Sequence, residues 1–156
     1  METLIIISYM LLFACTSMYF GTGWSLVLFS FPTARDLTPA NYYTHIVPQV
    51  QAATRIFTWM TNLMIVLAIV MIISEWGEPF GWVPWVVLGG VAAATALTIF
   101  GIFKHNKRLT EGIEDPNELT ETLVAWMRLN VFRVGLWTVQ WLAMAVWFVA
   151  AAVEAA

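Results

Sequence analysis

Four long apolar runs without a charged side chain dominate the sequence, at residues 4–31, 56–73, 83–103 and 134–153. The hydrocarbon layer of a bilayer is about 30 Å thick, and a helix needs roughly 20 apolar residues to cross it. Hydrophobic residues make up 60% of the chain and charged residues 11%, a balance far too apolar for a soluble core. The sequence therefore predicts an all-α integral membrane four-helix bundle.

Local signals refine the boundaries of these helices. A segment rich in Gly and Pro, residues 77–84, interrupts the helical pattern between the second and third runs. Nothing breaks the chain between residues 120 and 152, so the fourth helix should begin before its charge-free run. We expect a single transmembrane domain over residues 1–156, with helices at about 4–31, 52–76, 83–103 and 120–152.

The longest connection, residues 32–55, should contain a short amphipathic helix. Thr38 followed by Pro39 is typical of a helix start, because a hydroxyl can cap the helix and proline suits its first position. We expect this helix over residues 39–47, lying on the membrane surface, with His45 at the mouth of the bundle and a bend at Pro48.

Basic residues indicate the orientation. With four crossings, all seven Lys and Arg residues fall on one side: Arg35, Arg55, Lys104, Lys107, Arg108, Arg128 and Arg133. Basic residues near short loops are retained in the cytoplasm. Both termini should therefore lie outside and connections 32–55 and 104–119 in the cytoplasm, in the inner membrane if the protein is bacterial. No basic arm suggests a nucleic-acid partner.

Small residues at spacings of four predict where helices touch, because association in lipid depends on close contact. The first helix offers Ser17, Gly21 and Ser25, and the third offers Gly89 with Ala93 and Gly90 with Ala94. We therefore expect these two helices to form the centre of the bundle. The single cysteine, Cys15, excludes an intramolecular disulfide.

A polar stripe runs along the fourth helix. Its members recur at spacings of three and four and so share one face: Trp126, Asn130, Arg133, Trp137 and Gln140. Polar groups within the hydrocarbon are costly and mark functional candidates, so this face should point into the bundle. His105 and Asn106 end the third helix at the same depth. In the alternative, Arg133 snorkels to lipid phosphates and Asn130 caps a neighbouring helix.

Metal binding and nucleophilic catalysis have little support. The two histidines, His45 and His105, belong to no metal-binding spacing, and no serine or cysteine is placed with a histidine and an acid. We expect no metal site, and the sequence indicates no particular cofactor.

The chain resembles the anthrone-oxygenase-like family of small four-helix membrane proteins. The resemblance follows the order of the helices and rests on Asn106 after the third helix and on Trp126, Asn130 and Arg133 at the start of the fourth. The family's usual Pro-Leu-Asn is replaced here by Lys104-His105-Asn106.

The resemblance implies a flat, oxidisable aromatic substrate that enters from the bilayer. In this interpretation Arg133 holds an anionic oxygen while Asn106 and Asn130 donate hydrogen bonds to it. Trp126 and Trp137 stack on the rings beside Gln140, and His45 or His105 acts as the base.

Two functions of different classes follow. One is an oxygenase-like enzyme acting on a lipophilic, anthrone- or quinol-like molecule at the cytoplasmic mouth. The other is a non-catalytic accessory subunit of a larger membrane complex. The partners expected are membrane lipid, a lipophilic small molecule or quinone, and either other membrane proteins or further copies of the chain.

Overall fold

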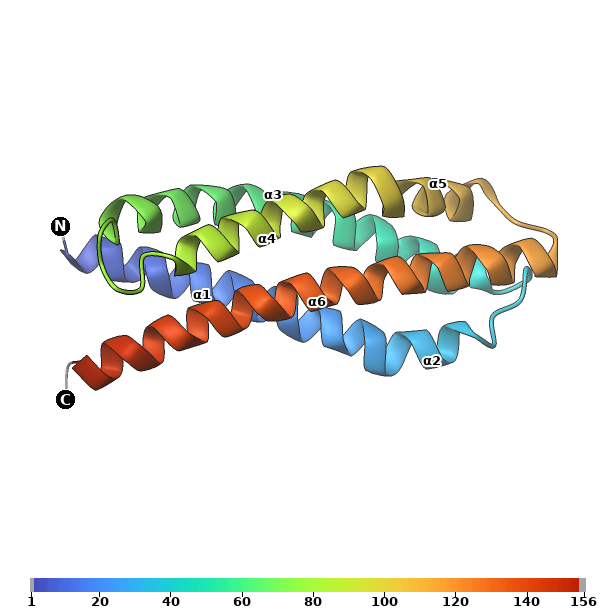
Figure 1. Cartoon of the computed structure of the whole chain (residues 1–156). Coiled ribbons are helices and arrows are strands. Elements are labelled where there is room, and N and C mark those ends of the chain that lie inside the picture. The colour runs from blue at the N-terminus through green and yellow to red at the C-terminus, as the bar shows by residue number, and fades with distance from the viewer. Residues whose placement is uncertain (1, 155–156) are drawn as a thin grey trace.

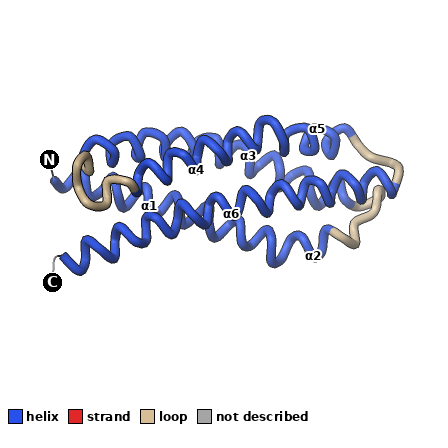
Figure 2. Tube along the Cα trace, in the orientation of Figure 1, coloured by secondary structure: helices blue, strands red, loops and turns tan. Residues whose placement is uncertain are grey.

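The computed structural model describes residues 2–154, which form only helices, turns and loops. Four long helical rods run antiparallel, with both ends of the chain at one end of the bundle (Figure 1). Loops are confined to the two ends (Figure 2). All four rods are long and apolar enough to cross a membrane. The predicted all-α four-helix bundle with the architecture of an integral membrane protein is confirmed.

The first rod comprises α1 (Glu2–Ser25), the π-helical turn η1 (Leu26–Ser30) and α2 (Phe31–Ala34), and the second is α3 (Tyr42–Ser74). The third comprises α4 (Val83–Leu97), a second π-helical turn η2 (Thr98–Ile102) and α5 (Phe103–Glu111), and the fourth is α6 (Pro116–Glu154). We call the end that carries the chain termini the terminal end. The opposite end, which carries Arg35, Lys104, Lys107 and Arg108, is the basic end.

The expected short helix on the membrane surface is absent as a separate element within the described range. Instead α3 is one continuous helix of 33 residues that includes Pro48. Proline removes only one backbone hydrogen bond, to the carbonyl of Thr44. The buried side chains of Tyr42, Ile46 and Val47 secure the turns around it. Packing of this first part of α3 against the bundle thus outweighs the helix-breaking effect of the proline.

The packing order of the helices also differs from the expectation. The main contacts join α1 to α3, α3 to α4, α4 to α6 and α6 to α1, so the rods form a ring. In this ring α1 and α4 lie on a diagonal and are not principal packing partners. The predicted centre formed by the first and third helices is therefore wrong, because the long α6 packs against both of them.

Glycines show where α6 comes close to its neighbours. A Cβ atom at Gly23 would lie 2.8 Å from Cε3 of Trp137, and one at Gly90 would lie 2.6 Å from Cγ of Gln140. A Cβ atom at Gly21, which was predicted to mark a contact, would have no described atom within 4 Å apart from the adjacent backbone of its own helix. The close approach in α1 is thus displaced by two residues from the predicted position.

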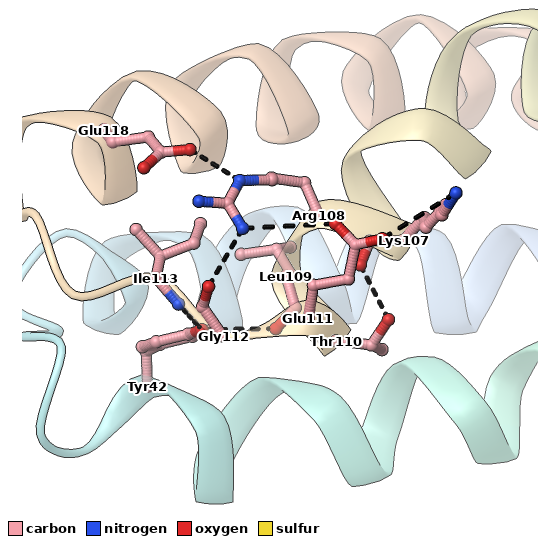
Figure 3. A network of polar contacts seen from close by, with 9 residues as sticks. All are labelled: Tyr42, Lys107, Arg108, Leu109, Thr110, Glu111, Gly112, Ile113 and Glu118. Carbon is pink, nitrogen blue, oxygen red and sulfur yellow. Dashed lines mark hydrogen bonds and ion pairs between the residues drawn. The ribbon is translucent and has the colours of Figure 1, made fainter.

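A polar network fastens the basic end of the bundle (Figure 3). The hydroxyl of Tyr42 donates to the carbonyl of Leu109 at 3.2 Å and accepts from the backbone N–H of Ile113 at 2.6 Å. Arg108 donates from Nε to Glu118 at 2.5 Å and from Nη1 to the carbonyl of Gly112 at 2.9 Å. These contacts tie the start of α3 to the end of α5 and the start of α6.

Candidate functional site

A cavity of about 820 Å³ lies between the rods in the half of the bundle nearer the basic end. Both π-helical turns contribute to its wall, through Leu26 and Ser30 of η1 and through Thr98 and Ile102 of η2. A π-helical turn inserts an extra residue into a helix and is frequently found at functional sites. The two irregular turns of the bundle thus face the same space.

The guanidinium of Arg133 projects into the bundle beside this cavity. It donates to Oδ1 of Asn130 and, at 3.4 Å, to Oγ1 of Thr98 in η2. Its central carbon also lies 4.7 Å from the centre of the Trp137 ring, a distance suited to a cation–π interaction. These internal contacts oppose the alternative in which Arg133 reaches lipid phosphates.

A chain of hydrogen bonds links Arg133 to the third rod. Asn130 is completely buried and donates from Nδ2 to the carbonyl of Trp126 at 2.8 Å. Trp126 in turn donates from Nε1 to Oδ1 of Asn106 at 2.8 Å. The structure thus brings together Asn106, Trp126, Asn130 and Arg133, as the sequence predicted. Asn130 bonds within α6 rather than capping another helix.

Two buried hydrogen-bond donors at the cavity lack a partner among the described residues. They are Nε of Arg133 and Nε2 of Gln140, whose residue is 1% exposed. Leaving a buried donor unpaired costs about 1–3 kcal/mol. Both residues line the cavity, and no Asp or Glu is among its described lining residues. The wall of the cavity therefore holds two unpaired donors and no described carboxylate, which suits a neutral or anionic group.

Aromatic rings of three rods meet at the wall of the cavity. The ring of Trp137 lies 4.6 Å from that of Tyr19 and 5.6 Å from that of Phe57, measured between centres. The Tyr19 hydroxyl contacts the carbonyl of Phe57 at 2.9 Å and Oγ1 of Thr61 at 2.7 Å. Trp137 is thus packed between the rings of Tyr19 and Phe57, with its own ring against the Arg133 guanidinium.

Neither histidine reaches this group. His45 is exposed, His105 is half-buried, and neither is among the described residues that line the cavity. In the third rod Ile102, Asn106 and Leu109 occupy the inward positions at helical spacing, and His105 lies beside that face. The expectation that His45 or His105 serves as the base at this cluster therefore has no geometric support. Over residues 2–154, no three His, Cys, Asp or Glu side chains are placed to hold a metal ion.

Sequence reasoning missed Thr98, Tyr19 and Phe57, which complete the site. Thr98 lies within a charge-free run, where a hydroxyl usually bonds its own helix, and it does donate to the carbonyl of Ala94 at 2.8 Å. No sequence signal showed that its oxygen also accepts from Arg133. The roles predicted for the clustered residues remain predictions.

Comparison of the chain with protein-family models, curated proteins and solved structures finds no match. The resemblance to the anthrone-oxygenase-like family therefore stays a prediction.

Replacing Arg133 with lysine should lower the free energy of unfolding by about 1–3 kcal/mol, because one ammonium cannot contact Asn130, Thr98 and the Trp137 face together. Arg128→Lys is the matched control, since Arg128 is exposed on the same helix. Unfolding of both variants by SDS in mixed micelles measures the difference. Equal stability of the two variants would show that these contacts do not hold the bundle together.

Proposed function

We propose that this protein binds a lipophilic molecule carrying hydrogen-bond acceptor oxygens, with the oxygen-bearing part inside the bundle. One observation carries the proposal: two residues that line the cavity, Arg133 and Gln140, each have a buried donor with no partner among the described residues. Buried polar groups in folded proteins are normally paired. A bound acceptor would supply the missing partner for both.

The shape and chemistry of the wall favour an apolar, ring-containing ligand. About 820 Å³ is within the usual range for small-molecule sites, which combine mainly apolar walls with a few placed polar groups. Trp126 and Trp137 offer ring surfaces, and Arg133 is the one charged residue among the described residues of the lining. A ligand with a carbonyl or an ionised hydroxyl would complement this arrangement.

The finer proposal, oxygenase-like chemistry, rests on the family resemblance. Arg133 and Gln140 would stabilise an enolate or phenolate oxygen, which is the form of an anthrone-like molecule that reacts with oxygen. The described lining residues include no histidine or carboxylate. The protein would therefore stabilise the anion by binding it and would not use a histidine or carboxylate base to remove the proton. Ligand binding is accordingly the part of the function that the geometry supports best, and an accessory subunit stays the alternative.

The purified protein in nanodiscs should bind naphthoquinone, with quenching of tryptophan fluorescence as the signal, and the hydrocarbon tetralin should compete poorly. Gln140→Leu should weaken naphthoquinone binding by about tenfold, because one hydrogen bond is lost. Gln51→Leu, at an exposed position outside the cavity, should have no effect. Competition by tetralin as strong as that by unlabelled naphthoquinone would contradict a site selective for oxygen.

We also propose that the basic end faces the cytoplasm and both termini face outward, in the inner membrane if the protein is bacterial. Support comes from the clustering of basic residues at one end of the bundle.

Single cysteines at Glu78 and Glu114, both exposed and in loops at opposite ends, test this orientation in a Cys15→Ser background. A membrane-impermeant thiol reagent applied to intact cells should label the cysteine at 78 and spare the one at 114 until the cells are opened. Labelling of position 114 in intact cells would overturn the orientation.

A further inference from the structure

We propose that the cavity opens sideways to the bilayer between α1 and α3, and that this opening holds the hydrocarbon tail of a lipid whose oxygen-bearing head lies inside. The inference rests on the proposed function and narrows the ligand from any lipophilic molecule to a tailed one.

Residues on the facing sides of two helices show the opening. On α1, Gly21 and Ser25 line the cavity and are exposed on the outside of the bundle. On α3, Thr54 and Thr58 do the same. Residues on two neighbouring helices that both line the cavity and are exposed indicate that the cavity reaches the surface between these helices. In a bundle that crosses a membrane along these helices, that surface faces lipid.

A defined contact bounds the opening toward the terminal end, where Tyr19 of α1 meets Phe57 and Thr61 of α3, with the two aromatic ring centres 4.8 Å apart. Toward the basic end, Ala34 of α2 and Ile46 of α3 line the cavity and are buried in one apolar cluster. The opening therefore begins at the Tyr19 contact and extends toward the basic end.

Gly21 keeps this gap wide. It has open space where a side chain would begin, with no described atom within 4 Å apart from the adjacent backbone of its own helix. Gly23, only two residues further on, is closely covered by Trp137. The glycine at position 21 is thus not required for contact with another described helix, and it leaves space where a tail would leave the cavity.

The positions of polar groups on the cavity wall determine how a ligand is oriented in the cavity. Hydroxyls at the opening already bond their own helices: Thr22 donates to the carbonyl of Met18 at 2.6 Å, and Thr54 donates to that of Val50 at 2.8 Å. They present mainly carbon to a ligand there. The unpaired donors of Arg133 and Gln140 lie on α6, across the cavity. An amphiphile would therefore place its oxygens inward and its tail toward the lipid.

The test compares naphthoquinone with a naphthoquinone that bears a long prenyl chain, using tryptophan quenching in nanodiscs. Gly21→Leu places a bulky side chain in the opening, and its Cβ meets no atom of another described helix. Gly21→Ala adds only a methyl group at the same position. Gly89→Leu is the matched control, because Gly89 also has open space at its Cβ, is exposed on a membrane-spanning helix and does not line the cavity.

We expect Gly21→Leu to weaken binding of the prenylated probe by about tenfold or more, since a bulky side chain in a filled site displaces ligand atoms. Gly21→Ala should have a smaller effect, Gly89→Leu should have none, and the tailless probe should bind all variants alike. Unchanged binding of the prenylated probe to Gly21→Leu would overturn the inference and leave the proposed function standing. An equal loss for both probes would also overturn it, because the leucine would then be deforming the head site. Failure of both probes to bind the wild type would overturn the proposed function itself.

Discussion

The burial of one guanidinium inside an apolar bundle is the constraint on which the central part of this structure depends. A charged side chain within the hydrocarbon is costly unless it is surrounded by polar or aromatic partners. Here Asn130, Thr98 and the ring of Trp137 surround Arg133. Each partner is in turn fixed: Asn130 by Trp126, Thr98 by its own helix, and Trp137 by Tyr19 and Phe57. All four rods are thereby linked around one charge.

The contacts around Arg133 leave a cavity between the rods. The two π-helical turns lie in the rods on either side of α6, and both line the cavity. The aromatic cluster of Tyr19, Phe57 and Trp137 supports the cavity wall, and the network around Tyr42 and Arg108 fastens the basic end of the bundle (Figure 3). The walls are thus well supported, whereas the donors of Arg133 and Gln140 inside them have no partner among the described residues. A rigid wall around unpaired donors is the condition expected of a preformed binding site.

Much of this could be predicted from the sequence. Four charge-free runs specify four membrane-length helices, and the spacing of Trp126, Asn130, Arg133, Trp137 and Gln140 places them on one face, because helical period is a local property. The neighbours of that face could not be predicted in the same way. Which helices are adjacent depends on packing between segments far apart in the chain, so the small residues of the first and third helices suggested a contact that α6 prevents. Pro48 shows the same limit, since tertiary burial of Tyr42 and Ile46 overrides a local helix breaker.

A protein whose cavity holds an oxygen-bearing lipid should retain that lipid when it is taken from its own membrane. The protein would be extracted with polymer into native nanodiscs, without detergent, and its bound small molecules identified by mass spectrometry. Ala94→Phe fills the cavity from α4, while Ala92→Phe adds the same ring to an exposed position of that helix outside the cavity. We expect a near-stoichiometric oxygen-bearing lipid in the wild type and in Ala92→Phe, and its loss from Ala94→Phe. Only bulk membrane lipids in the wild type, or equal retention by Ala94→Phe, would contradict it. A stoichiometric protein partner without such a lipid would favour the accessory subunit instead.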